Sequence, residues 1–129
     1  MKRTNRNLIL TSLLGGLTIL LGAFGAHTIK DLVTETALQS FETAVRYQFY
    51  HVLALLIINS IPLVSDKHTN TISYFFFAGI LFFSGSIYLL TLGIPATYIW
   101  FVTPFGGVLF LLGWLYLAYS FSKSDCIKK

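Results

Sequence analysis

The polar side chains with the greatest chemical potential in this chain lie in one short segment that leads into an apolar stretch. They are Glu42, Arg46, Tyr47, Gln48, Tyr50 and His51. On a helix, residues four apart lie on one face, so Arg46 is a neighbour of Glu42 and of Tyr50. These residues and His27, which follows the first apolar stretch, predict a polar site near one membrane surface, which we name the outer polar cluster. Such a group is suited to bind a lipid headgroup, a quinone-like ring or a proton.

A purely structural interpretation of the same residues is simpler. Arg46 can extend to the lipid headgroups, and Glu42 can pair with it in water. His51 can stay neutral while it hydrogen-bonds Tyr47 or a neighbouring helix. Polar residues in the outer third of a membrane helix are tolerated without a special function. Residue type and spacing leave both interpretations open.

Signatures of catalysis and of metal binding are missing from the sequence. Ser-Gly-Ser at 84–86 does not fit the nucleophile elbow of hydrolases, and the single Cys126 has no base near it in the chain. A metal site would need His27 and His51 to meet from separate helices, without a close-spaced ligand motif. We therefore predict no catalytic residue, no metal and no cofactor, and a protein that is not an enzyme.

The elements that must hold the outer polar cluster follow from the distribution of charge. Of the 129 residues, 11% are charged and 55% are hydrophobic. Charges are absent from residues 7–29, 47–65 and 68–122. Because a transmembrane helix needs about 20 apolar residues, these stretches predict one, one and two spans, which excludes a soluble enzyme. We expect one all-α membrane domain, residues 1–129, with spans at about 8–26, 43–64, 72–92 and 99–121.

Local patterns predict where the helices begin. In the mixed segment 28–41, apolar residues recur at helical spacing, which favours a short interfacial helix between the first two spans. Thr36 resembles the first residue of a capping box, so the second long helix is expected to begin near Ala37. Thr103 and Pro104 either open the fourth helix as its cap and first residue or kink a helix already under way.

Basic residues predict the orientation in the membrane. If both termini are cytoplasmic, Lys30 and Arg46 are the basic residues on or near the outer side. The cytoplasmic ones are Lys2, Arg3, Arg6, Lys67, Lys123, Lys128 and Lys129. This distribution satisfies the positive-inside rule and predicts a multi-pass plasma membrane protein with its N- and C-termini in the cytoplasm. The basic residues form no patch interleaved with stacking aromatics, so nucleic acid is not an expected partner.

Small residues recur at intervals of seven on three of the expected spans. They are Gly15 and Gly22 on the first span, Gly79, Ser86 and Gly93 on the third, and Gly106, Gly113 and Ser120 on the fourth. An interval of seven keeps one stripe facing a partner when helices cross left-handed at about +20°. Because close backbone approach stabilises helix pairs in lipid, we expect a compact, mainly left-handed four-helix bundle that packs through these residues.

Several blocks together resemble one known family. They are GAFGAH (22–27), FETAVRYQFYH (41–51), FSGSIY (83–88) and TPFGG (103–107), followed by Gly113-Trp114. This pattern resembles domain of unknown function family 423, which contains small bacterial membrane proteins and a eukaryotic relative, transmembrane protein 256. The resemblance implies four spans and no established activity. The positions that it supports as family motif, without roles, are His27, Arg46, Gln48, Tyr50, His51, Ser84, Tyr88, Thr103, Pro104 and Gly106.

Three functions remain open from the sequence. The first is a non-catalytic protein that supports the membrane or assembles with a membrane complex. The second is binding or permeation of a lipid, a small amphiphile or a proton at the outer polar cluster. An enzyme is the least favoured, because no nucleophile, base and electrophile can be assembled from the motifs. Expected partners are the lipid bilayer and either a second copy or another membrane protein.

Overall fold

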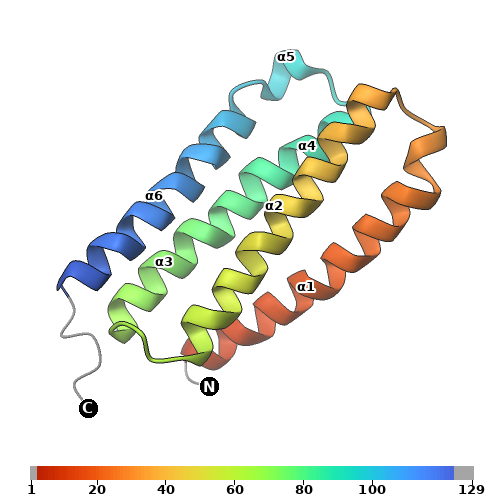
Figure 1. Ribbon diagram of the computed structural model, residues 1–129. Helices are drawn as coiled ribbons and strands as arrows, with labels where there is room; N and C mark the ends of the chain where they lie inside the picture. The colour runs from red at the N-terminus through yellow and green to blue at the C-terminus, as the bar shows by residue number, and fades with distance from the viewer. Residues whose placement is uncertain (1–2, 124–129) are drawn as a thin grey trace.

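The computed structural model describes residues 3–123, which form helices joined by short turns (Figure 1). The elements are α1 (Arg3–His27), the 3-10 turn η1 (Ile29–Asp31), α2 (Glu35–Ser60), α3 (Asp66–Gly79), the π-helical segment η2 (Ile80–Ser84), α4 (Gly85–Thr91), α5 (Ala96–Ile99) and α6 (Val102–Lys123). No strand occurs among these residues, so the predicted all-α class is confirmed. Outside the described residues lie Lys2, Cys126, Lys128 and Lys129.

Three helical segments within residues 3–123 are long and apolar enough to cross a membrane. They are Asn5–Asp31, Asp66–Thr91 and Ala96–Lys123. The predicted spans at about 8–26, 72–92 and 99–121 fall on these segments. The predicted second span, 43–64, falls on α2, which is not one of the three and ends at Ser60.

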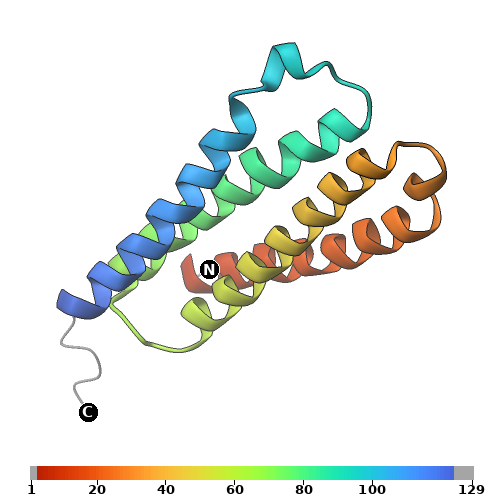
Figure 2. The same cartoon turned by 45° about the horizontal axis from the view of Figure 1, so that its top comes forward.

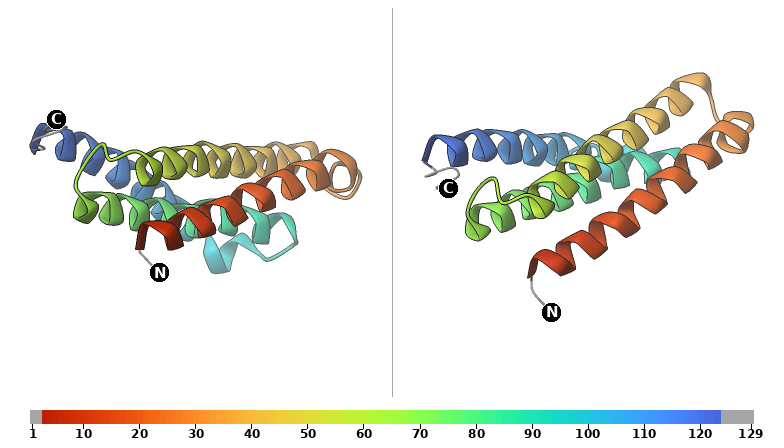
Figure 3. Two further views of the ribbon diagram at one scale, coloured as in Figure 1. Left: turned by 90° about the horizontal axis from the view of Figure 1, so that it is seen from below. Right: turned by 60° about the horizontal axis from the view of Figure 1, so that its bottom comes forward.

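The helices are arranged one beside the next. α3, η2 and α4 follow one another as a single rod, which we name the central rod (66–91). α1 packs along α2, α2 packs on the central rod, and α6 packs on the other side of that rod (Figures 1 and 2). The start of α1, the end of α6 and the 61–65 loop lie at one end, and η1 and α5 lie at the opposite end, which we name the loop end (Figures 1 and 3).

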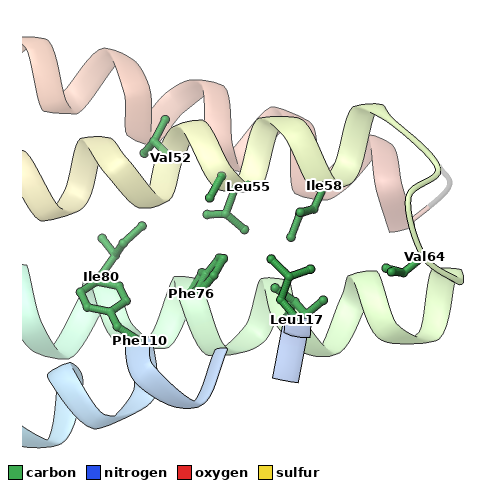
Figure 4. Close-up of a cluster of buried hydrophobic side chains, with 10 residues drawn as sticks. Val52, Leu55, Ile58, Val64, Phe76, Ile80, Phe110 and Leu117 are labelled. Atoms are coloured by element: carbon green, nitrogen blue, oxygen red, sulfur yellow. The ribbon is translucent and has the colours of Figure 1, made fainter. Parts of the chain in front are cut away.

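The buried core lies between α2 and the central rod, with contributions from α6 (Figure 4). Its main members are Val52, Leu55, Ile58, Ile72, Phe76, Ile80, Phe110 and Leu117. By contrast, large apolar side chains of α1 and α6 are exposed, including Leu13 and Leu20 on α1 and Leu111 and Leu115 on α6. An apolar surface of this extent is suited to lipid or to another protein.

The start of α2 differs from the sequence prediction. Thr34, two residues before Thr36, is the N-cap, and its hydroxyl accepts a hydrogen bond from the amide nitrogen of Ala37 at 3.2 Å. The expected interfacial helix within 28–41 is a single 3-10 turn, η1, anchored by the buried side chain of Ile29. Thr36 has the residue type of a cap, but the helix begins two residues earlier than predicted, at Glu35, after the three residues that follow the 3-10 turn.

Pro104 lies inside the first turn of α6. The helix begins at Val102, and the amide of Phe105 already donates to the carbonyl of Phe101 at 3.1 Å. The alternative in which Thr103 caps the helix is wrong, because Val102 is already helical and Pro104 is the third residue of the helix. In the first turn the missing N–H of proline has no partner to lose, so the residue is accommodated without disrupting the helix.

Most of the predicted small residues lie at helix contacts. A Cβ at Gly15 would stand 3.4 Å from Val52, and one at Gly22 would stand 3.6 Å from Val45. Four others lie between α6 and the central rod. There, an added Cβ would meet Phe110 at Gly79, the backbone of Phe82 and Phe83 at Gly106, and Phe76 at Gly113, while the hydroxyl of Ser120 lies 3.0 Å from Nδ1 of His68.

Two residues of the predicted stripes do more than allow close helix packing or take no part in it. The Ser86 and Thr103 hydroxyls lie 2.5 Å apart and join α4 to α6, so Ser86 links helices by a hydrogen bond as well as by its small size. Gly93 is a turn residue with φ of +100°, and no atom lies within 4 Å of where its Cβ would stand. The expected packing role of Gly93 is wrong, because α4 ends at Thr91 and the chain needs a left-handed residue there.

Candidate functional site

Gln48 is the centre of the buried part of the outer polar cluster. Its side chain is 1% exposed and faces α1 and the central rod. The amide nitrogen donates to Thr18 Oγ1 at 2.8 Å and to the Leu14 carbonyl at 3.3 Å, and the amide oxygen accepts from the Tyr88 hydroxyl at 2.7 Å. Both amide hydrogens and the amide oxygen are therefore engaged, and one side chain ties α2 to α1 and α4.

His51 lies one turn further along α2 and is also buried. Its Nδ1 is 2.7 Å from the Tyr47 carbonyl oxygen, and its Nε2 accepts from Trp114 Nε1 of α6 at 3.0 Å. A carbonyl only accepts and an indole N–H only donates, so the ring is neutral with its hydrogen on Nδ1. The ring also stacks on Phe110 with 3.6 Å between centroids. This geometry agrees with the purely structural interpretation of His51, in which the neutral ring hydrogen-bonds Tyr47 or a neighbouring helix.

Replacing His51 by phenylalanine is expected to lower the free energy of unfolding by about 1 kcal/mol. The new ring keeps the stack on Phe110, but the indole N–H of Trp114 loses its acceptor. The midpoint of thermal unfolding in detergent measures the loss. Changing Trp114 to phenylalanine as well removes the orphaned donor, so the double variant should lose less stability than the sum of the two single variants; a fully additive loss would contradict this bond.

Glu42, Arg46 and Tyr50 lie on the exposed side of α2. Arg46 donates to Thr43 Oγ1 at 3.1 Å. Among the described residues no ion pair joins Arg46 to Glu42, so the pairing considered from the sequence is not formed. Tyr47 is 41% exposed and packs against Phe83 with 5.0 Å between ring centroids.

His27 is separate from the rest of the outer polar cluster. It is exposed at the last residue of α1. The antiparallel helices place Gly25 against Phe41, so His27 is level with about residue 39 of α2. His51 is twelve residues further along α2, which corresponds to about 18 Å at 1.5 Å per residue. The predicted cluster thus divides into a buried pair, an exposed group and an isolated histidine.

The exposed group borders two hollows between α1 and α2 that share Gly22, Val45 and Arg46; together we name them the α1/α2 groove. The first, of about 340 Å³, is lined by Gly22, Gly25, Phe41, Glu42, Val45 and Arg46. The second, of about 430 Å³, is lined by Thr18, Ile19, Gly22, Ala23, Val45, Arg46, Phe49 and Tyr50. The groove exists because α1 presents glycine and alanine where larger side chains would fill the space.

A larger hollow, of about 590 Å³, opens at the loop end between α2, α4, α5 and α6. Its lining includes Trp100, Pro104 and the hydroxyl residues Ser40, Thr43, Thr91 and Thr103. The Ser40, Thr43 and Thr91 hydroxyls donate to carbonyls one turn earlier in their own helices, and Thr103 pairs with Ser86. Since the hydrogens of these hydroxyl groups are already engaged within the protein, the hollow could hold a ligand mainly by fit to its surface.

A second buried polar network, which the sequence did not predict, lies at the end opposite the loop end. Asn7 of α1 donates to the side-chain oxygens of Asn59 at 3.0 Å and Asn70 at 3.3 Å, and Asn59 donates to Ser73 Oγ at 2.9 Å. This network joins α1, α2 and α3. Asn59 was a usable signal, because an asparagine inside an apolar stretch needs a partner on another helix.

No group of three or more histidine, cysteine, aspartate or glutamate side chains within residues 3–123 is placed to hold a metal ion. The nitrogen atoms of His51 are engaged by Tyr47 and Trp114, as described above.

Comparisons with known proteins give a consistent match. The family described as "Protein of unknown function (DUF423)" matches residues 21–107. A UPF0382 membrane protein of Haemophilus influenzae is 38% identical over 123 residues, which cover 95% of this chain and 98% of that protein. A UPF0382 membrane protein of Staphylococcus aureus is 45% identical over 96 residues, 74% of this chain and 78% of that protein. No solved structure matches the chain.

Proposed function

Because this chain belongs to the DUF423 family, whose relatives are named membrane proteins, we propose that it is a non-catalytic integral membrane protein that supports the membrane or a membrane complex. The observation that carries the proposal is the hydrogen bonding of its buried polar side chains. Gln48 and His51 are the strongest candidates for internal chemistry. Gln48 uses its amide groups in hydrogen bonds to α1 and α4, and His51 uses its ring nitrogens in hydrogen bonds to Tyr47 of its own helix and to Trp114 of α6. Neither retains a free group for acid, base or nucleophilic work.

In the proposed arrangement four helices cross the plasma membrane in a mainly left-handed bundle, with both termini cytoplasmic. α2 has 26 residues, about 39 Å at 1.5 Å per residue, and lies alongside α1 and the central rod, which belong to two of the three apolar segments. Arg6, Lys67 and Lys123 lie near one end of the helices, whereas Lys30 lies in η1 at the other. This distribution supports a cytoplasmic location for the end that carries the three basic residues.

The supporting role is proposed to be exerted through the exposed faces of α1 and α6. These faces carry large apolar side chains. α1 and α6 are the outer helices of the row, so each has one face that packs against its neighbour and one face that does not. A second copy of the chain or another membrane protein is suited to cover them, since helix association in lipid depends on surface fit.

A proton-flux assay combined with native mass spectrometry tests the non-catalytic proposal. Liposomes that contain the protein and an internal pH dye are expected to take up protons, under a potassium diffusion potential, at the rate of protein-free liposomes. Mass spectra of protein released from native lipid are expected to contain a second copy or a partner protein. Proton flux that disappears in His51→Phe at unchanged fold would contradict the proposal, as would a protein that is monomeric in every lipid mixture.

The second candidate function is binding of a lipid or another small amphiphile at the exposed part of the outer polar cluster. The α1/α2 groove favours it, because the groove brings the charges of Glu42 and Arg46 next to a surface that is almost wholly apolar. A site with a polar end and an apolar length is complementary to an amphiphile.

A further inference from the structure

Two opposite charges line the first hollow of the α1/α2 groove without being paired with each other. Glu42 and Arg46 lie one turn apart on α2, a spacing that normally allows an ion pair. The guanidinium instead donates to Thr43 Oγ1 at 3.1 Å, and both charged side chains are exposed. The hollow therefore offers a carboxylate and a guanidinium to one ligand.

The second hollow continues from Arg46 along an apolar wall. Its lining includes the side chains of Ile19, Ala23, Val45 and Phe49. Gly22 belongs to both hollows, so the polar and apolar parts of the groove are continuous. An acyl chain laid in this part would cover apolar surface on two helices.

The polar end of the α1/α2 groove also lies at the depth in the membrane where lipid headgroups are expected. Tyr98 and Trp100 at the loop end are 73% and 69% exposed, as expected of aromatic residues at a membrane interface. The apolar segment that contains α1 ends with η1 at Asp31, and η1 also lies at the loop end. Glu42 lies about two turns inside the N-terminus of α2, within reach of the headgroup region for a long or extended side chain.

We propose that the α1/α2 groove binds one phospholipid whose headgroup is zwitterionic and carries a primary ammonium. The phosphate binds Arg46, the ammonium binds Glu42, and one acyl chain lies along the apolar wall formed by Ile19, Val45 and Phe49. This inference rests on the second candidate function and names its ligand class.

The pair of charges discriminates between headgroups. A primary ammonium donates charge-assisted hydrogen bonds to a carboxylate, whereas a quaternary choline has no N–H to donate. An anionic glycerol headgroup would satisfy Arg46 but offers Glu42 only neutral hydroxyl donors, which bind a carboxylate less strongly than an ammonium does. Ethanolamine phospholipid is therefore the expected ligand among common bacterial headgroup types.

Native mass spectrometry of the purified full chain, mixed with equal amounts of ethanolamine, choline and glycerol phospholipids of identical acyl chains, tests the proposal. The wild type is expected to retain ethanolamine lipid several-fold over the other two. Glu42→Gln is expected to lose this preference and to favour the glycerol lipid, and Arg46→Gln to lose most retention of all three. Glu35→Gln and Lys30→Gln make the same charge changes outside the groove and are expected to behave as wild type.

The outcomes distinguish failure of lipid binding in the groove from failure of the headgroup assignment. If the folded wild type retains no phospholipid, the second candidate function fails and this inference fails with it. If lipid is retained through Arg46 but ethanolamine is not preferred, or Glu42→Gln leaves the preference unchanged, only the assignment of the headgroup is overturned. The thermal midpoint of each variant in detergent shows whether it is folded, because exposed charges are not expected to alter the midpoint strongly.

Discussion

Replacing Gly106 by alanine is expected to reduce the free energy of unfolding by about 3 kcal/mol, the upper part of the range for overpacking a close contact. A Cβ on Gly106 would overlap backbone atoms of Phe82 and Phe83 in η2. Backbone of a helix cannot rotate away as a side chain end can, so α6 must move off the central rod. The midpoint of thermal unfolding in detergent measures the effect.

Two other glycines provide matched controls for this substitution. A Cβ on Gly107 would stand 3.8 Å from the Phe83 ring, an ordinary contact, and one on Gly16 would have no atom within 4 Å. Because alanine favours a helix over glycine by about 1 kcal/mol, both control variants should be as stable as the wild type or more stable. Equal midpoints for Gly106→Ala and Gly107→Ala would mean that α6 and η2 do not approach as closely as described.

Gly106 packs against the π-helical segment η2, a feature that no sequence pattern predicted. Within 80–84 the helix widens, and the hydroxyl of Ser84 reaches the Ala44 carbonyl at 2.7 Å. The sequence marked Gly106 as a small residue facing a partner. It did not identify the partner as backbone, because that depends on a local change of helix type.

The apolar helices themselves were predictable from charge alone. A long run without charges has few alternatives to a buried or membrane helix, which is why three of the expected spans coincide with the apolar segments. Boundaries were less predictable, because they depend on single contacts. Thr34 rather than Thr36 caps α2.

The sequence located the outer polar cluster on the correct segment of α2. It did not show which of these side chains are buried and which are exposed. Helical spacing groups Arg46 with Tyr50 and separates them from Gln48, yet it does not say which face turns inward. That choice depends on partners far away in the chain, such as Thr18 of α1 and Tyr88 of α4. Only the packed helices reveal that Gln48 is buried while Arg46 borders a groove.

Replacing Gln48 by leucine is expected to lower the free energy of unfolding by about 2 kcal/mol. Leucine fits a similar volume but leaves the hydroxyl of Tyr88 without its acceptor, and α1 loses its bond from the amide. One interhelical hydrogen bond in a membrane protein contributes about 0.6 kcal/mol on average, so the larger value reflects the loss of bonds to two helices. Thermal unfolding in detergent, compared with wild type, measures it.

A double-mutant cycle with Tyr88→Phe separates the hydrogen bond from packing. Tyr88→Phe alone is expected to reduce stability by about 1 kcal/mol, since the Gln48 oxygen then loses its donor. In the Gln48→Leu background the same change should have a smaller effect, because the hydrogen bond between Tyr88 and Gln48 is already absent there. The coupling would show that Gln48 joins α2 to α4 directly; full additivity of the two losses would instead mean that each side chain stabilises the fold through separate contacts.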